Sequence, residues 1–361
     1  MNVYIFYGRV RQYGGIERNI LALAQVVAAS GITPVLICFE DQVDLHRESG
    51  GVLQVKVIGS GNMLKRVLRI REIVAANAND STSLIICFGV WGGAFLSMTG
   101  LGYLLHYTDP PSVMPEMVSW FQKVKFSLLS NAAIRRAKSC ITMTERNARE
   151  LRHRFGRDFD VIYQGGVPPP VGFEINCDNR VLRLVSVCRL HASKNLDWAI
   201  ELHQACMQDE RLKDKFTRIE LLLIGDGPER DKLQEMAVKS NSVDSVKLLG
   251  FCTSEEIERI MATANIAVVP GVQGYGLPVL EALYRGMYVL LNEASGISEI
   301  LGEDARVCIS RNSKADFIKS GIDFLSALDM KLLPDVYVSS RGELPTEDSW
   351  GQALGRAARW W

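Results

Sequence analysis

The stretch IAVVPGVQGYGLPVLEALYRG, residues 266–286, joins a short apolar run to a glycine-rich turn and an apolar helical segment. The β-branched run predicts a buried strand, and Pro278 fits the first turn of a helix that Gly286 ends. In a parallel sheet, ligands bind in the loops that follow the carboxyl ends of the strands. Gly274 and Gly276 let the backbone approach a ligand closely, and the free amides of the helix's first turn suit a phosphate. The stretch therefore predicts a strand–turn–helix unit of a parallel α/β fold, with an anion site at its turn.

A lone carboxylate, Glu281, stands in the middle of this apolar helix. Burying a carboxylate costs free energy unless donors surround it, and the vicinal hydroxyls of a sugar would supply such donors. The alternative is a glutamate that caps a neighbouring amide or pairs with a surface arginine. The residue by itself favours neither interpretation.

The alternation of short β-branched runs with helix-length segments continues along the whole chain, which is typical of parallel βαβ units. A chain of 361 residues favours two domains, and the proline-rich segment QGGVPPPVG, residues 164–172, separates two such series as a linker. We therefore predict an α/β protein with two doubly wound domains, residues 1–168 and 169–345, that face each other across a cleft. Residues 346–361 are expected to form a terminal helix that packs on either domain. Strands are expected at residues 3–7, 33–39, 53–59, 83–89, 103–108, 139–144, 160–165, 182–188, 220–225, 246–251, 266–271, 288–293 and 306–310.

One uncharged segment, residues 81–105, is long enough to span a bilayer. Five glycines interrupt it, however, and parallel strands covered on both faces are also apolar throughout. We favour a buried strand, a short helix and a second strand over a membrane span. Met1 leads directly into the first predicted strand without a basic region or a cleavage site, so we expect no secretory signal.

The charge distribution distinguishes the two halves of the chain. The net charge is zero, which argues against a dedicated nucleic-acid-binding protein. Residues 1–170 carry 19 lysines and arginines against 13 aspartates and glutamates, an excess that suits an anionic membrane surface or a lipid-linked diphosphate. Two basic amphipathic stretches, residues 63–74 and 120–138, would also lie well on an anionic membrane. Uneven surface charge and the solvated faces of ordinary helices are the alternatives.

Cysteine usage indicates a reducing compartment. The eight cysteines include no CxxC pair, and Cys38, Cys87, Cys140 and Cys188 lie inside strand-like apolar runs. Such residues are typical of buried thiols in a cytosolic protein rather than of disulfides or a zinc site.

Two cations follow the first predicted strand of the second half. Arg189 lies just past that strand, and Lys194 stands at a helix start that Ser193 would cap. At the carboxyl end of a strand, the two side chains would clamp a diphosphate and stabilise the negative charge that grows on a leaving group, without a metal. As an ordinary surface pair they would carry no function.

Two further glycine turns open helices. Gly225 and Gly227 form a tight turn before Pro228, which we expect at the first helical position, and a simple turn explains this pattern equally well. Gly14 and Gly15 precede the first helix of the chain and predict a second helix start with free amides.

Taken in this order, the segments resemble the family 4 retaining glycosyltransferases, which have the GT-B fold of two Rossmann-like domains. The resemblance extends along nearly the whole chain. It implies that residues 1–168 bind the acceptor and residues 169–345 bind the nucleotide sugar, and that the helix at residues 346–361 crosses back to the N-terminal domain. Each motif alone is weak, and the ordered set is specific. The motifs are GGIER (14–18), SCITMTERNARELRHRFG (139–156), VIYQGGV (161–167), CRLHASKN (188–195), LLLIGDGPER (221–230), VKLLGF (246–251), GYGLPVLEALYRG (274–286) and SWGQAL (349–354).

The resemblance implies roles for individual residues. Arg189 and Lys194 match the pair that holds the donor diphosphate, and Glu281 matches the second acid of the Glu-x7-Glu motif, which bonds the nucleotide ribose. Where the family has the first Glu, this chain has Gln273, which keeps one acceptor, adds two donors and loses the charge. The departure bears on the sugar preference and on activity itself.

The resemblance also implies the remaining donor contacts. His106 resembles a histidine that approaches the donor sugar from the N-terminal domain, although a satisfied core histidine is the alternative. Backbone amides of the glycine-rich turn would contact the sugar and phosphates, and the end of the strand at 246–251 would contact the base. The implied donor-binding residues are Gly14, Gly15, Phe251, Cys252, Gln273, Gly274, Tyr275, Gly276 and Leu277.

We expect neither a metal nor a cofactor. Asp158 and Asp160 spell the Asp-x-Asp site of GT-A transferases, but they open the strand expected at 160–165, outside either wall of the predicted cleft. None of the five histidines shows metal-ligand spacing.

The sequence and the resemblance therefore predict a metal-independent retaining glycosyltransferase of the hexosyl type. Its expected partners are a nucleoside-diphosphate sugar, such as a UDP- or GDP-sugar, and a glycan acceptor, which we expect to be a lipid-linked bacterial surface polysaccharide. The expected location is the cytoplasm, at the inner face of the plasma membrane. A GT-B sugar-nucleotide epimerase and a non-catalytic GT-B binding protein are the alternatives. A dinucleotide-dependent oxidoreductase is disfavoured, because neither half opens with a GxGxxG turn.

Overall fold

The computed structural model describes residues 1–76, 83–108, 120–240, 242–302, 305–328 and 344–361. These residues divide into two compact units. Unit 1 comprises Met1–Gln164 together with Pro345–Trp361, and unit 2 comprises Gly165–Leu344. Each unit has its own parallel sheet, so the α/β class predicted from the sequence is confirmed.

Unit 1 is built on a seven-stranded sheet with the order β5-β3-β1-β6-β7-β8-β9, and all of its strand pairs are parallel. The chain leaves β1 toward β3 and β5, and then returns past β1 to β6, which makes the sheet doubly wound. The strands are β1 (Asn2–Tyr7), β3 (Thr33–Cys38), β5 (Gln54–Val57), β6 (Ile85–Phe88), β7 (Tyr103–Tyr107), β8 (Ser139–Thr142) and β9 (Asp160–Val161), with a separate short pair of β2 (Arg9–Val10) and β4 (Glu40–Asp41).

Helices cover both faces of this sheet, and each face has its own apolar core. One face is covered by α1 (Gly15–Ala29), α2 (Leu45–Glu48) and α15 (Glu347–Ala357). The other face is covered by α3 (Met63–Ala75), α4 (Val90–Leu96), α5 (Trp120–Arg136) and α6 (Glu145–Phe155). The carboxyl ends of β1 and β6 therefore lie at the edge where the two layers of helices separate.

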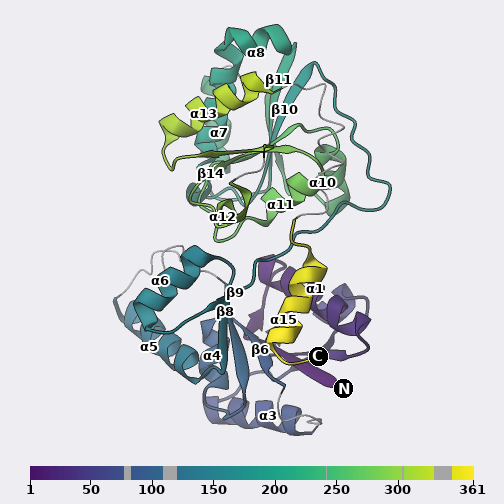
Figure 1. Ribbon diagram of the computed structural model, residues 1–361, viewed down its shortest axis with the longest axis vertical. Helices are drawn as coiled ribbons and strands as arrows, with labels where there is room; N and C mark the ends of the chain where they lie inside the picture. Colours follow the sequence, from purple (N-terminus) through teal and green to yellow (C-terminus); the bar gives the residue numbers. More distant parts are fainter. Residues whose placement is uncertain (77–82, 109–119, 241, 303–304, 329–343) are drawn as a thin grey trace. The chain divides into compact units, whose positions relative to one another are not determined.

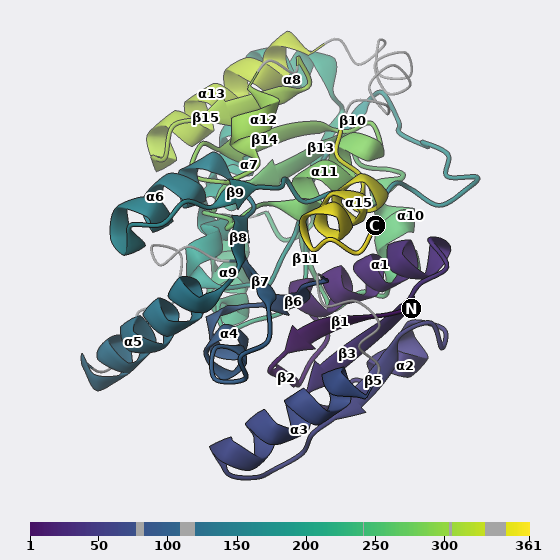
Figure 2. The ribbon, with the colours of Figure 1, turned by 60° about the horizontal axis from the view of Figure 1, so that its bottom comes forward.

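The C-terminal helix α15 lies beside α1 in unit 1, as Figures 1 and 2 both show. Gly351 makes this close packing possible, because a Cβ there would lie 2.8 Å from the Val26 side chain of α1. The neighbouring Trp350 is 1% exposed and completes the core of that face. The chain thus crosses from unit 2 back to unit 1 before it ends.

The uncharged segment forms β6, α4 and β7 from residue 83 onward, as the sequence predicts. Gly93 lets α4 pack against α5, because a Cβ at that position would lie 2.9 Å from the Ala133 Cβ. Among the described residues, no helix is both long and apolar enough to cross a membrane.

Unit 2 is built on a six-stranded parallel sheet with the order β12-β11-β10-β13-β14-β15. Its strands are β10 (Val181–Val187), β11 (Arg218–Ile224), β12 (Val246–Gly250), β13 (Ile266–Val269), β14 (Tyr288–Asn292) and β15 (Val307–Ser310). Its helices are α7 (Leu196–Gln208), α8 (Glu210–Lys215), α9 (Arg230–Lys239), α10 (Ser254–Met261), α11 (Leu277–Tyr284), α12 (Ser298–Leu301) and α13 (Lys314–Ala327), with a 3₁₀ turn at Ala192–Lys194. The strand order reverses between β10 and β13, which makes this sheet doubly wound as well.

Close helix packing holds the layers of unit 2 together. Gly321 of α13 faces Leu202 of α7 and Leu290 of β14, and a Cβ there would lie 2.8 Å from each side chain. On the segment that enters the unit, Gly166 packs against Leu280 of α11 at a corresponding distance of 2.7 Å. Both helix layers are therefore set by glycines that larger residues cannot replace without a shift.

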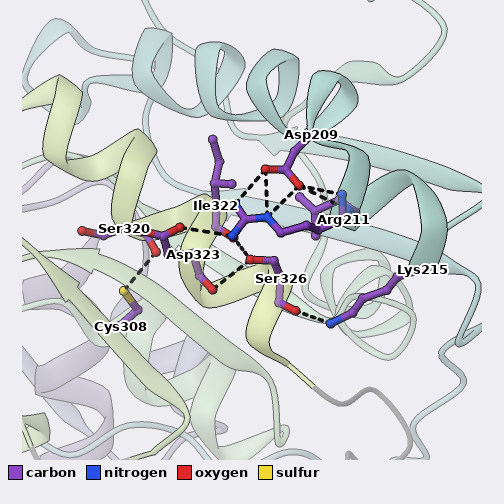
Figure 3. A network of polar contacts seen from close by, with 9 residues as sticks. Asp209, Arg211, Lys215, Cys308, Ser320, Ile322, Asp323 and Ser326 are labelled. Atoms are coloured by element: carbon purple, nitrogen blue, oxygen red, sulfur yellow. Dashed lines mark hydrogen bonds and ion pairs between the residues drawn. The ribbon is translucent and has the colours of Figure 1, made fainter.

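A polar network joins α8 to α13 (Figure 3). Arg211 pairs with Asp209 at 2.8 Å and with Asp323 at 3.5 Å, and Lys215 donates to the Ser326 carbonyl. Because α8 ends shortly before β11 begins, the network lies toward the amino ends of the strands. Its side chains are largely exposed, and exposed ion pairs contribute little to stability. We assign this network to the scaffold and not to the site.

Candidate functional site

The candidate site of unit 2 lies where the strand order reverses, at the carboxyl ends of β10 and β13. These strands are parallel neighbours, with Leu184 opposite Ile266 and Val185 opposite Ala267. The chain continues from β10 into α7 and from β13 into α11, on either side of the reversal. In doubly wound sheets this point is where ligands bind.

Gly271 lets the two loops that follow these strands touch through their backbones. A Cβ at position 271 would lie 2.3 Å from the Lys194 Cα and 2.5 Å from the Ser193 carbonyl oxygen. Real Cβ contacts are never so short, so any larger residue would push the loops apart. Gly271 therefore determines where the Lys194 backbone lies.

The turn after β11 supports the same loop from its other side. A Cβ on Gly225 would lie 2.0 Å from the Cys188 carbonyl oxygen, and one on Gly227 would lie 2.3 Å from the Leu190 carbonyl oxygen. Both glycines also have positive φ angles, of 124° and 159°. The GxG turn thus serves packing. The expected place of Pro228 was wrong, since α9 begins two residues later, at Arg230.

The prediction that Ser193 caps a helix starting at Lys194 was also wrong. Lys194 ends the 3₁₀ turn Ala192–Lys194, whose cap is His191, with the His191 Nδ1 accepting from the Ser193 N–H at 3.3 Å. Asn195 then adopts a left-handed conformation, with φ of 48°, and α7 starts after it. The sharp bend between the two helical segments presents the Lys194 side chain to the β13 loop.

The two cations occupy different environments. Lys194 is half-buried, and its Nζ donates to the Gln273 Oε1 at 2.7 Å, which joins the β10 loop to the β13 loop. Arg189 is exposed and makes no ion pair with the described residues. Its guanidinium is therefore available to an incoming anion.

Loop residues after β14 hold the turn between β13 and α11. The Ile297 N–H donates to the Tyr275 carbonyl at 2.8 Å, the Gly296 N–H to the Gln273 carbonyl at 3.2 Å, and the Asn292 side chain to the Pro270 carbonyl at 2.9 Å. Tyr275 is only 4% exposed, so its side chain contributes to packing, and a donor contact from its backbone stays a prediction.

The first turn of α11 offers fewer amides than the sequence suggests. Gly276 caps the helix with a φ of 122°, Pro278 has no N–H, and the Val279 N–H donates to the Gly276 carbonyl at 3.0 Å. The N–H groups of Gly276 and Leu277 make no hydrogen bond within the described residues. An anion at this helix end would thus meet two amides, and the helix dipole favours it there.

The other implied donor contacts of unit 2 surround these loops. Glu281 lies half-buried one turn into α11. At the far side, Phe251 is 85% exposed directly after β12, and Cys252 next to it is half-buried. Gly274 lies half-buried in the turn itself. Every residue of this group stands at the carboxyl edge of one sheet.

Comparison with known proteins shows which family this region matches. Residues 174–332 match the family model for glycosyl transferases group 1. These residues belong to the glycosyl transferases group 1 family. The group 1 domain contains every donor contact expected in unit 2, and the family inferred from the sequence is confirmed there.

Relatives of the chain resemble it over less than half of its length. The amylovoran biosynthesis glycosyltransferase AmsK of Erwinia amylovora is 30% identical over 173 residues, which are 46% of this chain and 41% of AmsK. The putative colanic acid biosynthesis glycosyltransferase WcaL of Escherichia coli K12 is 29% identical over 167 residues, which are 44% of this chain and 40% of WcaL. The chain thus spans about two fifths of the length of these relatives.

A solved structure resembles the whole chain. HepE of Anabaena, in complex with UDP, aligns with 99% of this chain and 100% of its own, with a TM-score of 0.80 and 15% identity. At that identity the likeness shows the fold, and the predicted GT-B fold is confirmed.

His106 lies outside the group 1 domain, in β7 of unit 1, and it is fully buried. Its ring lies 5.0 Å from the Phe88 ring and 6.2 Å from the Trp350 ring, and neither ring nitrogen has a hydrogen-bond partner among the described residues. A side chain without exposed surface cannot contact a ligand while the core is closed. We therefore keep His106 as a core residue and not as a contact of the donor sugar.

Burial lowers the pKa of His106 to about 4, from 6.5 in the unfolded chain. The unfolded state therefore binds a proton between these values that the folded state does not, so stability is complete above pH 6.5 and falls as the pH drops toward 4. The slope reaches about 1.4 kcal/mol per pH unit, and the total is roughly 3 kcal/mol. We expect His106→Phe to reduce the loss of unfolding free energy between pH 7.5 and pH 5 by about 2 kcal/mol in urea denaturation. An unchanged pH dependence would show that His106 is solvated in the native state.

The helix start at Gly14 and Gly15 already binds a carboxylate of the chain itself, that of Glu17, which was not among the predicted site residues. The carboxylate of Glu17, 6% exposed, accepts hydrogen bonds from the backbone of Gly14 and of Glu17 itself and from the Tyr7 hydroxyl. Burial nevertheless raises the pKa of Glu17 above its usual value. A glutamate three residues after the cap residue is a common helix-start pattern, so the sequence did contain a signal for this contact. A donor contact from Gly14 or Gly15 stays a prediction.

The two acids of the Asp-x-Asp sequence each contact a neighbouring side chain. Asp158 pairs with Arg152 at 3.2 Å, and the Asp160 carboxylate accepts from the Ser139 hydroxyl at 3.5 Å at the start of β9. Within the described parts of the chain, no group of three or more histidine, cysteine or acidic side chains is arranged to hold a metal ion.

Proposed function

We propose that this protein is a retaining glycosyltransferase that moves a sugar from a nucleoside diphosphate to a glycan acceptor. The observation that carries the proposal is the junction of the β10 and β13 loops, where Lys194 reaches Gln273 at 2.7 Å and Arg189 stands without an ion pair in the described chain. A cation pair beside a helix start is suited to a diphosphate. The membership of residues 174–332 in the glycosyl transferases group 1 family supports the same activity.

The proposed reaction needs positioning and charge stabilisation more than covalent chemistry. The bond between the anomeric carbon and the diphosphate oxygen breaks while the acceptor hydroxyl oxygen bonds to the same carbon from the same face. The hydroxyl proton passes to the departing phosphate oxygen. Arg189, Lys194 and the amides of Gly276 and Leu277 would stabilise the negative charge that grows on the diphosphate, without a metal or a cofactor. Glu281 would accept hydrogen bonds from the ribose hydroxyls, and Phe251 would contact the base.

The orientation of Gln273 suggests which sugar group it meets. An ammonium group has donors only, so the amide oxygen of Gln273 must face Lys194 and its NH₂ group points elsewhere. That NH₂ group would donate to an acceptor on the donor sugar, such as a carbonyl or a carboxylate oxygen. A glutamate at this position would instead accept from sugar hydroxyls.

Gln273→Glu should therefore weaken binding of the nucleoside diphosphate about tenfold, because the new carboxylate would pair with Lys194 and reduce its charge toward the phosphates. Titration calorimetry measures the change. The control Gln234→Glu adds the same charge on the exposed face of α9 and should leave affinity within twofold. Transferase activity that appears only in Gln273→Glu would contradict an active wild-type enzyme and favour the non-catalytic alternative.

For the acceptor we propose a lipid-linked bacterial surface polysaccharide, handled at the cytoplasmic face of the membrane. AmsK and WcaL bear names that refer to amylovoran and colanic acid biosynthesis. The basic helix α3 also exposes three apolar side chains, Met63 at 56%, Leu64 at 67% and Leu68 at 47%. Basic residues mixed with exposed apolar ones suit a peripheral contact with an anionic membrane.

A thermal-shift panel of UDP, GDP, ADP, CDP and NAD tests the proposed donor. A ligand at 100 times its dissociation constant stabilises a protein by about 2.7 kcal/mol, which raises the melting temperature by several degrees. We expect one nucleoside diphosphate to respond and NAD to be inert. UDP is the first candidate, since HepE binds UDP in its solved structure. Turnover of the sugar nucleotide without any acceptor would favour the epimerase, and no response at all would contradict the proposal.

A further inference from the structure

The carboxyl end of β12, in unit 2, has an irregular backbone where it meets the turn after β11. The register between the two strands shifts just before Gly250, which leaves Leu249 as an extra residue. Gly250 then has a positive φ of 73°, and its carbonyl accepts from the Gly225 N–H at 2.8 Å. Bulges of this kind redirect a strand and are frequent next to active sites. The β11 turn thus holds the end of β12 at the point where Phe251 leaves the sheet.

Arg230, the first residue of α9, reaches this strand end. A Cβ at position 250 would lie 3.1 Å from the Arg230 Nη1 and 3.9 Å from its Nη2, so the guanidinium packs against the backbone of Gly250. The glycine leaves the space that the guanidinium occupies. Phe251, the next residue along the chain, is 85% exposed. The guanidinium therefore lies beside the residue that we expect to contact the nucleotide base.

The guanidinium of Arg230 keeps its donors unused within the described chain. Its ion-pair partner there is Asp226, whose Oδ1 lies 3.8 Å from Nη1, beyond hydrogen-bonding distance. That Oδ1 instead accepts the Gly227 N–H at 2.7 Å. The Arg230 side chain is 42% exposed. A ligand that approaches from solvent therefore meets a planar group with open donors.

Two further carboxylates of this region are engaged elsewhere. Glu229 pairs with Lys232 at 2.7 Å, and Glu256 accepts the Thr253 N–H at 2.7 Å as part of the capping box of α10. Among the described residues, neither carboxylate forms an ion pair with Arg230. The charge of the guanidinium is thus left for a ligand.

A guanidinium has donors only, so it distinguishes nucleotide bases by their acceptors. Uracil offers the keto oxygen O4, and guanine offers O6 and N7. Cytosine and adenine carry an amino group at the position of that keto oxygen. An amino group facing the guanidinium would place donor against donor and leave both without a partner. A guanidinium at the end of β12 therefore favours a base with a keto group.

We propose that Arg230 is a specificity-determining residue that selects a donor nucleotide with a keto base, uracil or guanine, over one with an amino base. Its guanidinium donates to the keto oxygen while the base packs on the Phe251 ring. The selection rests on the proposed transferase function, because it requires that the donor base binds at the end of β12.

Titration calorimetry with UDP, CDP, GDP and ADP tests the selection. Within the UDP–CDP pair and within the GDP–ADP pair, the ribose and diphosphate are the same and the keto group is exchanged for an amino group. We expect UDP to bind about tenfold or more tightly than CDP, or GDP to show the same preference over ADP. The pair that shows the preference identifies the base as a pyrimidine or a purine.

Variants of Arg230 assign the preference to its side chain. Arg230→Ala should weaken the preferred diphosphate about tenfold and leave its amino counterpart within about twofold, so the preference disappears. Arg230→Lys keeps the charge but not the planar fork, and it should not restore the preference. The control Arg180→Ala removes an exposed arginine that precedes the amino end of β10, and it should change no affinity more than about twofold. Unchanged melting temperatures establish that the variants fold.

The outcomes separate the selection from the proposed function. Equal affinity for keto and amino bases, or a preference that persists in Arg230→Ala, overturns the role of Arg230 and leaves the transferase standing. Equal losses for all four diphosphates in Arg230→Ala also overturn it, because that pattern indicates a contact with the shared diphosphate. If none of the four diphosphates binds the wild type, the proposed function is overturned, and the selection with it.

Discussion

Lys194→Ala is expected to abolish the thermal stabilisation that a nucleoside diphosphate gives the wild type, and Arg189→Ala to reduce the affinity at least tenfold. A charge-assisted contact with a phosphate is worth about 1.5–3 kcal/mol, and Lys194 makes its contact from a half-buried position. Loss of a group that stabilises the departing charge should also lower kcat by about 100-fold to 1,000-fold. Thermal shift and the release of nucleoside diphosphate measure the two effects.

A matched control for this prediction is Lys319→Ala, which removes an exposed cation from α13 of the same unit. It should leave both measurements unchanged. If Lys194→Ala and Arg189→Ala respond to the nucleotide as the wild type does, the diphosphate clamp at the β10 loop is wrong.

Gly271→Ala is expected to destabilise unit 2 by about 3 kcal/mol or more and to eliminate nucleotide binding. The added Cβ would collide with backbone atoms of Ser193 and Lys194, which cannot yield as a flexible side chain would. Separating the β10 and β13 loops would also break the bond between Lys194 and Gln273. Urea unfolding and the thermal-shift response report the two losses.

Gly302→Ala provides the comparison, because a Cβ at Gly302 would meet nothing within 4 Å. It should be neutral within about 0.5 kcal/mol. A Gly271→Ala protein that is as stable as this control, with its nucleotide response intact, would show that the two loops do not touch in solution.

The strands were largely predictable from the sequence because they are covered on both faces and form continuous apolar runs. The run expected at residues 160–165 is the informative exception, since only Asp160–Val161 pairs with β8. Further on, the Gln164 side chain donates to Asn19 of α1. Strand propensity does not show where a chain leaves the sheet, because that depends on partners distant in the sequence.

The predicted helix boundaries were wrong where more than one nearby residue could cap the helix. Ser193 and Pro228 each fit a common helix-start pattern, but His191 supplies the cap of the 3₁₀ turn and α9 starts at Arg230. In both places the neighbouring loop packs against a glycine turn, and that contact determines the backbone. The sequence shows the glycines but not which backbone they approach.

The parts of the site differ in how well a sequence can show them. Lys194 and Gln273 follow two strands, so the parallel fold itself predicts that they meet. His106 offers no such signal, because its apolar neighbours are the same whether the ring faces a ligand or the core. Arg230 and Gly250 belong to different elements, and their contact is visible only in the folded chain.

The most direct test of the account is a crystal structure with the nucleoside diphosphate that responds in the thermal-shift panel. We expect the diphosphate at the carboxyl edge of unit 2, with phosphate oxygens within hydrogen-bonding distance of the Lys194 Nζ and of the Gly276 or Leu277 amide. A nucleotide bound elsewhere, with Lys194 still bonded only to the protein, would contradict it.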